Sequence, residues 1–439
     1  MTKENGKNMK RRMAAAVLAF ICSIFASPSW AQSDTLLIQP ALPDDFDRGR
    51  NISVQQRARP DYDAVGIRAG SFDFYPQLSV AGGYSDNLYY SRNDKVDGGF
   101  VVINPAFRLN SDWSRHSVQL QGGAEIRRYF SESPRNQTPW NLGAMAALDI
   151  ADAIRITPEL QAARQYENAF SGETTADTAI LSNYLRTYAG LRSEYTAGQA
   201  KFTLSVNDTN YDFSNVETLS GTVIDQSDRD RNLVRLTGQA QYAFTPSVSV
   251  YVQAGYTDTN YDRRLLSGND NRDSNDYRLI GGFNFDLAGL MRGTIGLGYS
   301  RRDFDSPLYR NVSGLSAEGK LEYFPSELTT VTLAVRRVVE DSSIDSSSGY
   351  FDNRALLQID HEFLTNLIAS AYGEFSRQDY IRSPLHLDVY RVGISNNYLS
   401  SNWLSFNFNL AYTSRSVNRP DLGRGFNEFS GQFGVTFKR

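Results

Sequence analysis

The sequence predicts an all-β fold, namely a single antiparallel transmembrane β-barrel of about 18 strands that follows a short irregular N-terminal periplasmic segment. Three observations carry this prediction. From Leu78 to the C-terminus, runs long enough to cross a bilayer alternate apolar with polar side chains. Short and long connections between these runs also alternate, and aromatic residues cluster near the ends of the runs.

The alternation has a physical cause. A strand that crosses a bilayer needs about 9–11 tilted residues, and every backbone polar group must find a partner within the protein, so the sheet has to close. One face then contacts lipid and the other contacts a polar lumen. Around residues 117–127, Val118 and Leu120 share the apolar face, whereas Gln119 and Gln121 share the polar face.

The first 31 residues are predicted to be a cleaved secretory signal peptide. A basic stretch at 7–12 precedes an apolar core at 13–26, and Ser29-Trp30-Ala31 provides a small-x-small cleavage site before Gln32. The alternative, a short membrane anchor, is disfavoured because the core is too short to span a bilayer. The only cysteine, Cys22, lies in this segment, so the mature chain is expected to contain no disulfide.

We predict an N-terminal periplasmic extension at 32–72 and the transmembrane β-barrel at 73–439. The extension contains proline and several arginines, among them Arg57 and Arg59, and has no sustained periodicity. A passive linker is the favoured interpretation of this extension. The alternatives are a plug of the lumen and a contact with a periplasmic export partner.

Composition excludes two broad classes of protein. Hydrophobic residues make up 41% of the 439 residues and the mean hydropathy is -0.43, which argues against a helical membrane protein. Removing residues 1–31 takes away five basic residues and Glu4, which leaves 40 basic and 48 acidic residues and a formal charge of -8. A nucleic-acid-binding protein would be expected to carry a basic excess instead.

The individual strands follow from the alternating runs and the turn residues between them. The predicted strands are 76–86, 100–110, 116–128, 140–150, 153–165, 184–195, 199–211, 232–244, 247–259, 276–287, 290–302, 312–323, 328–339, 353–363, 366–377, 388–398, 403–414 and 427–437.

The connections orient this barrel. Short turns such as 151–152 and 196–198 alternate with longer charged loops such as 166–183, 212–231 and 260–275. Outer-membrane barrels have short periplasmic turns and long extracellular loops, so an even strand count leaves both chain ends in the periplasm. A soluble β-sandwich or propeller is disfavoured, because its second face would not be so uniformly polar.

Aromatic residues fit two interfacial girdles. Those on the short-turn side are Trp113, Tyr195, Tyr242, Phe244, Phe285, Tyr323, Phe363, Tyr398, Trp403 and Phe437, and those on the long-loop side are Tyr84, Tyr256, Tyr277, Tyr299, Tyr350, Tyr390 and Tyr412. The last predicted strand alternates up to Phe437 and resembles the C-terminal signal of the barrel assembly machinery, although Lys438 and Arg439 follow the aromatic residue.

Distinctive residues surround the first predicted strand. They are Arg57-Ala58-Arg59-Pro60-Asp61-Tyr62-Asp63, Gly66-Ile67-Arg68-Ala69-Gly70-Ser71-Phe72, Tyr84-Ser85-Asp86-Asn87, Pro105 and Ser111-Asp112-Trp113-Ser114-Arg115-His116. From Arg57 to its C-terminus the chain resembles a family of outer-membrane β-barrel porins, whose members often occur in exopolysaccharide synthesis and export loci of Gram-negative bacteria. The resemblance implies a barrel and a link to polysaccharide secretion, and it transfers no functional residue.

The sequence offers little for catalysis or metal binding. Its three histidines have no nucleophile motif around them, so we expect no enzyme activity, no catalytic residue and no cofactor. Two loops are rich in aspartate, one with Asp258, Asp262, Asp270, Asp273 and Asp276 and the other with Asp225, Asp228 and Asp230. Because their spacing fits no calcium loop, solvated surface loops are favoured over a calcium site, and no metal site is predicted.

The polar face predicts the functional surface. By parity, the selectivity residues expected to face the lumen are Arg127, Arg155, Arg192, Arg235, Arg278, Arg336, Arg354 and Arg391 with Glu125, Glu159, Glu318 and Glu374, and the same parity adds Arg292, Glu194, Glu322, Asp360 and Glu362. Opposed charges tune which solute passes a pore. The alternative is that they pair and hold an occluded lumen together. Tyr188, Tyr251 and Tyr372 would either stack on sugar rings or fill space.

Three functions remain open at this point: a conduit or accessory for exopolysaccharide secretion, a general or anion-preferring porin for small solutes, and a non-conducting structural or surface-interaction barrel. The first is favoured by the resemblance. The expected location is the cell outer membrane. The expected partners are outer-membrane lipid and lipopolysaccharide, the barrel assembly machinery and periplasmic polysaccharide-export components, with no nucleic acid.

Overall fold

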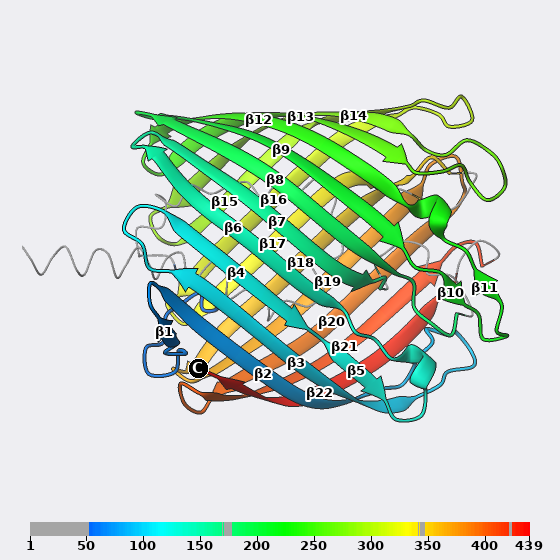
Figure 1. Ribbon diagram of the computed structural model, residues 1–439, viewed down its shortest axis with the longest axis horizontal. Helices are drawn as coiled ribbons and strands as arrows, with labels where there is room; N and C mark the ends of the chain where they lie inside the picture. The colour runs from blue at the N-terminus through cyan, green and yellow to red at the C-terminus, as the bar shows by residue number, and fades with distance from the viewer. Residues whose placement is uncertain (1–51, 169, 171–177, 341, 343–346, 421–423) are drawn as a thin grey trace, which may run out of the picture.

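The computed structural model describes residues 52–168, 170, 178–340, 342, 347–420 and 424–439. The predicted signal peptide and residues 32–51 of the predicted extension lie outside the described residues. The described chain forms a closed antiparallel barrel of 18 strands, which confirms the predicted fold class and strand count. The strands run obliquely around the barrel, with the C-terminus at one end of it (Figure 1).

The wall consists of consecutive antiparallel neighbours. Its strands are β2 (Phe72–Ser85), β3 (Gly98–Ser111), β4 (Ser117–Ala124) continued by β5 (Ile126–Tyr129), β6 (Trp140–Ala151), β7 (Ile154–Tyr166), β8 (Asn183–Ala197), β9 (Ala200–Phe213), β12 (Arg231–Thr245), β13 (Val248–Tyr261), β14 (Ser274–Leu287), β15 (Met291–Phe304), β16 (Val312–Ser326), β17 (Thr329–Glu340), β18 (Tyr350–Leu364), β19 (Leu367–Tyr380), β20 (His386–Leu399), β21 (Leu404–Val417) and β22 (Phe426–Lys438). β4 and β5 act as one wall strand, because both pair with β3 in an unbroken register.

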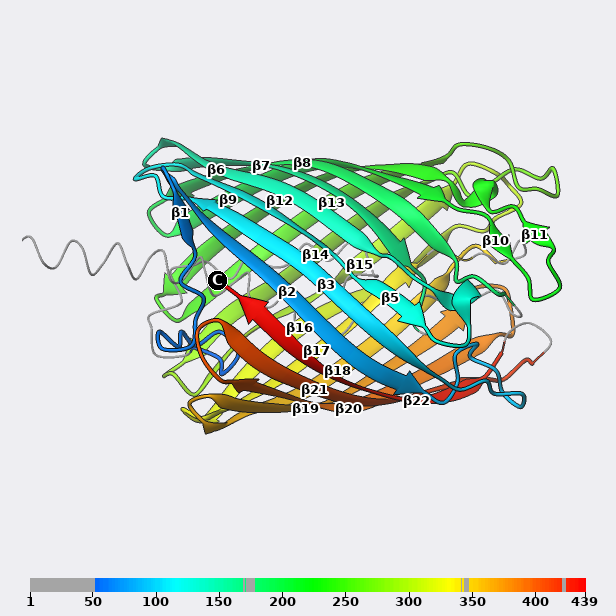
Figure 2. The same ribbon diagram turned by 60° about the horizontal axis from the view of Figure 1, so that its bottom comes forward.

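The barrel closes where the first wall strand meets the last. β2 pairs with β22 in antiparallel register, with Leu78 opposite Phe437 (Figure 2). Because every wall strand then has two neighbours, no sheet edge is left for lipid to face. Both ends of the wall lie on the short-turn side, as the even strand count requires.

The turns on that side are tight hairpins. Between β14 and β15, Ala288 and Gly289 both have positive φ, 50° and 84°. Two successive left-handed residues are the signature of a type I′ turn, whose twist matches that of the flanking strands. The sequence predicts this turn at Gly289, and the structure adds Ala288 as its other left-handed residue.

Alternation in burial separates the two faces of the wall. In β14, Tyr277, Leu279 and Phe283 are exposed, whereas Arg278 and Asn284 are buried. An isolated barrel exposes its lipid-facing side chains and shields those that project into the lumen. The apolar face is therefore the outer face, and the polar face lines the lumen.

The aromatic residues of the outer face pair across neighbouring strands near the rims. The ring centroids of Tyr256 and Tyr277 lie 5.3 Å apart on the long-loop side, and those of Trp403 and Phe437 lie 6.3 Å apart on the short-turn side. Cross-strand aromatic pairs stabilise a sheet. They also place an amphipathic ring where lipid headgroups lie.

Several strands extend further at the loop side than the sequence predicts. β18 begins at Tyr350 instead of 353, and β19 ends at Tyr380 instead of 377. Tyr350, which is predicted for the long-loop girdle, instead lies inward in this extension, buried against Tyr380 with ring centroids 4.9 Å apart. Inward aromatic residues break the polar-inward alternation on which the predicted strand bounds rest.

Small elements outside the wall were not predicted. They are the strand β1 (Ile67–Ala69) on β2, the hairpin of β10 (Val216–Glu217) and β11 (Val223–Ile224), and the 3-10 turns η4 (Ser133–Arg135) and η5 (Ser227–Arg229). These elements are too short to carry a periodic signal. Within the described part of the chain, no helix has the length and apolar character needed to cross a membrane.

Candidate functional site: the barrel lumen

The twelve selectivity residues predicted by parity all lie on the inward side of the wall. They are Arg127, Arg155, Arg192, Arg235, Arg278, Arg336, Arg354, Arg391, Glu125, Glu159, Glu318 and Glu374. Their strands keep an unbroken two-residue alternation through these positions, so no bulge reverses their direction. Their surroundings nevertheless divide eleven of them into two groups, while Arg391 on β20 lies apart, against the ring of Phe170. A role for any of them in selectivity stays a prediction.

The first group forms what we call the ion-pair wall, the inward charged side chains of β14–β19. Arg278 contacts Glu318 at 2.9 Å, and each side chain is only 5% exposed. Arg336 and Arg354 share the Asp352 carboxylate at 2.8 and 3.0 Å. Ion pairs this well shielded are strong only when both charges remain, because one alone would be a buried uncompensated charge.

Further contacts link these pairs into a network. The Asp352 carboxylate also accepts a 2.6 Å hydrogen bond from the Ser376 hydroxyl, and Arg354 lies 3.6 Å from Glu374. Arg292 contacts Glu322 at 2.5 Å. The opposed charges of this wall are therefore paired, whereas the occluded lumen that the alternative also predicted stays a prediction.

The pair between Arg278 and Glu318 bridges two strands that are not neighbours. Arg278 lies on β14 and Glu318 on β16, while β15 between them presents Gly296 and Ser300 at the facing positions. A larger inward residue on β15 would obstruct the bridge. Small residues on the middle strand thus allow the two long side chains to meet.

The second group lies on what we call the amide wall, the inward side of β4–β13. Its glutamines are Gln119 and Gln121 on β4, Gln161 and Gln165 on β7, Gln239 and Gln241 on β12 and Gln253 on β13. Gln253 donates to Gln239 at 3.0 Å, and Gln241 donates to the Ser249 hydroxyl at 3.0 Å. We did not predict these glutamines as functional, although their period-two spacing was visible in the sequence.

Charged residues on the amide wall make mostly local contacts. Arg127 pairs with Glu125 on the same strand at 2.9 Å, and the Arg235 Nε donates to the Thr257 hydroxyl at 3.3 Å. Glu159 accepts from Gln161 at 2.5 Å. Near one of the short turns, Arg155 contacts Asp149 at 2.7 Å. Arg192 remains exposed.

The three inward tyrosines lie against the wall. The Tyr251 ring occupies the space over Gly282 and Gly296, where an added Cβ would meet its ring atoms or hydroxyl. Tyr188 lies over Gly190 and Tyr372 over Gly393 in the same way. A side chain at any of these glycines would displace the ring that covers it, so the glycines allow the rings to lie against the wall.

At the loop end, Phe170 docks on the opposite side of the lumen from its own strands. It belongs to the connection between β7 and β8, yet its ring packs on Val389 of β20 and Phe426 of β22. The Arg391 and Arg354 guanidinium carbons lie 4.6 and 5.1 Å from the ring centroid. The buried Gln378 amide donates to the Phe170 carbonyl at 2.9 Å. This contact covers part of the ion-pair wall.

The aspartate-rich loops use some of their carboxylates to cap strand ends. Asp230 accepts from the Phe213 backbone N–H and Asp273 from that of Tyr261, both at 2.6 Å. Burial raises the pKa of Asp230, with Asp212 and Asp262 adding to the rise and the Phe213 N–H opposing it. Among the described residues, no group of three or more His, Cys, Asp or Glu side chains is arranged to hold a metal ion.

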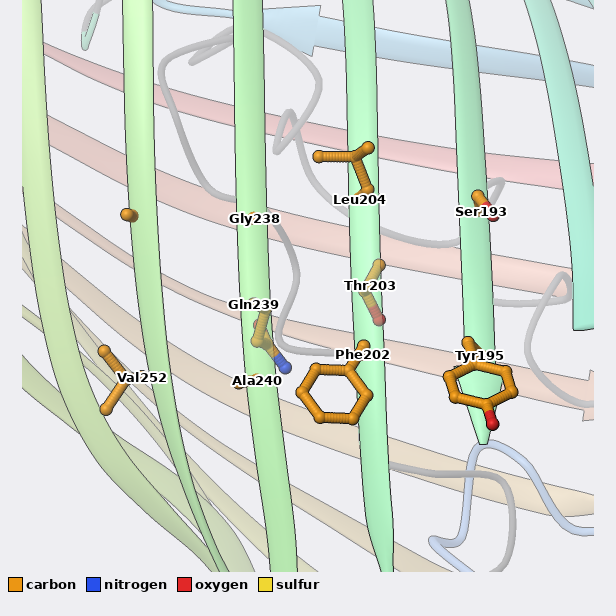
Figure 3. A pocket seen from close by; sticks show the side chains of 10 residues that line it. Ser193, Tyr195, Phe202, Thr203, Leu204, Gly238, Gln239, Ala240 and Val252 are labelled. Carbon is orange, nitrogen blue, oxygen red and sulfur yellow. The ribbon is translucent and has the colours of Figure 1, made fainter. Parts of the chain in front are cut away.

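A hollow of about 430 Å³ lies on the outer face of the wall, not in the lumen. Its floor includes Gly238, Ala240 and Ala254, and Figure 3 shows Phe202 and Val252 at its sides. These residues share the parity of the exposed apolar face. Lipid-facing small residues flanked by larger ones account for this hollow, so the lumen is the candidate site.

The family model described as "Putative beta-barrel porin 2" matches residues 59–439. No curated protein sequence matches this chain. Among solved structures, the chain is similar to OpdL of Pseudomonas aeruginosa, with 12% identity, a TM-score of 0.44, and coverage of 84% of this chain and 99% of OpdL. It is also similar to OccAB4 of Acinetobacter baumannii, with 11% identity, a TM-score of 0.45, and coverage of 83% and 98%.

Proposed function

We propose that this chain, which belongs to the family described as "Putative beta-barrel porin 2", is an outer-membrane channel. Through this channel a hydroxyl-rich exopolysaccharide leaves the cell. The observation that carries this proposal is the amide wall. A primary amide both donates and accepts hydrogen bonds, and sugar hydroxyls do the same. Gln241 and Gln253 are buried, so the partly exposed Gln119, Gln121, Gln161 and Gln239 are the side chains that offer a sliding sugar chain successive exchangeable partners.

The electrostatics support an uncharged or weakly charged cargo. The strongest charges of the lumen, on β14–β19, neutralise one another across short distances such as the 2.9 Å between Arg278 and Glu318. Conduction needs binding that is favourable enough to admit the cargo and weak enough to release it. Amides meet this condition better than buried ion pairs.

An inward tyrosine adds an apolar patch to the same path. Tyr188 on β8 lies over Gly190 of the amide wall, where its ring can pack against the C–H face of a sugar ring, whereas Tyr251 is buried over Gly282 and Gly296. Aromatic surface of this kind supplies contact area without a fixed charge.

This proposal makes the protein a channel and not an enzyme. Lipopolysaccharide and other outer-membrane lipid would surround it, and the barrel assembly machinery would insert it. Periplasmic components of polysaccharide export would deliver the polymer to the short-turn end. The signal peptide proposed at residues 1–31 would direct the chain across the inner membrane.

A second candidate, an anion-preferring porin for small solutes, is favoured by one observation. Arg155, Arg192 and Arg235 share the amide wall with the glutamines, and Arg155 and Arg192 are exposed. Exposed cations in a lumen attract small anions.

Deletion of the gene separates these functions. The polysaccharide conduit predicts that secreted polysaccharide falls severalfold while uptake of small anions is little changed, and that the wild-type gene restores secretion. Unchanged secretion with impaired anion uptake would instead establish the second candidate. Absence of any single-channel conductance from the purified protein would favour a non-conducting barrel over both.

A further inference from the structure

Residues 53–59 run inside the lumen at its periplasmic end, although they precede the first wall strand. Val54 is completely buried and packs on Ile368 and Leu399, with Tyr62 against the same cluster. The Val54 backbone N–H donates to the Thr330 hydroxyl at 2.9 Å. Burial of an apolar side chain stabilises a segment that is docked on the protein, so a passive linker would not be expected to bury Val54.

Polar contacts fix the register of this segment. The Gln55 side-chain amide donates to Asp360 and to the Ser370 hydroxyl, both at 2.9 Å. Gln56 accepts a 3.1 Å hydrogen bond from Arg292. The receiving residues lie on β15, β18 and β19, and all of them face inward.

Two arginines converge on one carboxylate. Arg57 and Arg59 lie 3.1 and 2.9 Å from the same oxygen of Glu362, whose side chain is 6% exposed. Arg59 also donates to the Val54 carbonyl at 2.9 Å, which closes the segment on itself. It further reaches the Thr365 carbonyl in a periplasmic turn at 3.1 Å. These bonds place the segment at the mouth of the barrel.

The contacts together span much of the ion-pair wall, from Arg292 on β15 to Ser370 on β19. We propose that residues 53–59 are an N-terminal clasp, which narrows the periplasmic mouth of the channel and widens it when released from Asp360 and Glu362. The clasp depends on the proposed function in one respect, namely that the barrel conducts. In this proposal, residues 53–59 act as a gate.

Charge determines how the clasp is released. Asp360 and Glu362 are nearly buried, and withdrawal of the segment opens both carboxylates to the lumen water. Glu362 then loses both arginines, whereas Asp360 loses Gln55 and keeps its hydrogen bonds from Gln358 and Ser370. Loss of one partner from a shielded ion pair is costly, which holds the clasp in place at rest. Release then exposes two negative charges at the mouth, so the open state has a stronger cation preference than the closed state.

The test uses the full chain in planar bilayers, with engineered cysteines to lock the clasp. Val54→Cys with Thr330→Cys joins positions that already share a 2.9 Å hydrogen bond. Arg57→Ala with Arg59→Ala removes the two cations that hold Glu362. The matched control is Arg68→Ala, since Arg68 lies at the same end but pairs with Asp73 and Asp112 instead of Glu362.

The disulfide-locked variant is expected to keep a low, steady conductance. The double-alanine variant is expected to conduct roughly twofold more, with reversal potentials shifted toward cations. In addition, reduction of the disulfide in a chain that also carries both alanines should convert low conductance to high. Each single-cysteine variant should be insensitive to reductant, and Arg68→Ala should conduct like the wild type.

Equal and non-zero conductance of the locked and released forms would overturn the clasp and leave the proposed function intact. Free reaction of the single Val54→Cys thiol with a charged reagent in folded barrels would likewise overturn the docking, because the Val54 side chain is completely buried in the docked segment. Absence of conductance in every variant would overturn the proposed function, and the gate with it.

Discussion

The two walls of the lumen are built from different chemistry and are exposed to different degrees. On the ion-pair wall, the Arg278 side chain is 5% exposed. On the amide wall, the Arg155 side chain is 47% exposed although it also faces inward and also pairs with a carboxylate. The difference shows that direction alone does not make a residue part of the path. The segments that cover the wall determine equally whether a residue can contact a solute.

The coverings come from distant parts of the chain. Residues 53–59 dock on β15–β19 at the periplasmic end, and Phe170 docks on β18–β22 near the loop end. Both therefore lie on the side of the ion-pair wall. We therefore propose that this side serves as the anchored, structural half of the lumen, and that the amide wall lines the conducting half.

The largest expected effect comes from breaking the ion-pair wall. Asp352→Ala leaves Arg336 and Arg354 facing each other without their shared carboxylate, so we predict a loss of about 3 kcal/mol in the free energy of unfolding. Urea unfolding in lipid vesicles, followed by heat-modifiable migration, measures it. The matched variant Glu159→Ala on the amide wall should cost less than about 1 kcal/mol. Equal losses of unfolding free energy in the two variants would contradict the division of the lumen into two walls.

Removing the amides should weaken cargo binding without unfolding the barrel. Gln121→Leu, Gln161→Leu and Gln239→Leu together remove three hydrogen-bonding sites worth about 1 kcal/mol each at most, so interruption of the current by neutral oligosaccharides should need roughly tenfold more sugar. Single-channel recordings measure the effect. The control is Gln358→Leu on the ion-pair wall. If this variant lost as much of the current block by sugar, the functional distinction between the two walls would be wrong.

Charge reversal distinguishes the walls through ion selectivity. Arg127→Glu with Arg235→Glu should move the reversal potential in a salt gradient toward cations by roughly 10–20 mV, because both positions face the proposed path. The swap of Arg278→Glu with Glu318→Arg keeps its pair and should leave the potential unchanged. An unaltered potential in the first variant would place those arginines outside the path.

The smallest expected effect concerns pH at the loop end of the amide wall. Burial raises the pKa of Asp230, so its contribution to stability is complete below about pH 4 and is lost as the pH rises through the raised pKa. Asp230→Asn keeps the oxygen that accepts from Phe213, as Asn418 does for His386. At pH 7 it should slow loop proteolysis roughly twofold.

Asp225 supplies the control of opposite sign. The Ser227 backbone N–H lowers its pKa, so its contribution is present at neutral pH and is lost as the pH falls through that lowered value. Asp225→Asn should therefore not slow proteolysis at pH 7. A similar slowing by both substitutions would refute the assignment to Asp230.

The sequence was sufficient to predict the strands of the barrel wall, because alternation and turn residues are local signals that extend over whole strands. It predicted the inward direction of Arg278 and Glu318, but not that they meet across β15, which depends on the small residues Gly296 and Ser300. Contacts between distant segments were also beyond its reach. Glu362 and Arg57 are 305 residues apart, and neither periodicity nor composition relates them.

The amides illustrate a different kind of miss. Gln161 and Gln239 were visible on the polar face. The prediction relied on charged side chains, however, and therefore assigned the functional surface to the arginines and carboxylates. In a lumen, however, opposite charges on nearby strands tend to pair, as Arg336 and Asp352 do. Neutral polar residues then remain as the groups available to a cargo.

Cysteine accessibility during single-channel recording tests the central claim most directly. Ser205 on β9 and Ser316 on β16 both face inward and differ in cover, since Ser316 is buried and Ser205 is only partly so. Serine-to-cysteine substitution is nearly isosteric at both sites. We predict that a charged thiol reagent changes the current through Ser205→Cys channels and leaves Ser316→Cys channels unaffected. The reverse result would contradict the assignment of the conducting path to the amide wall.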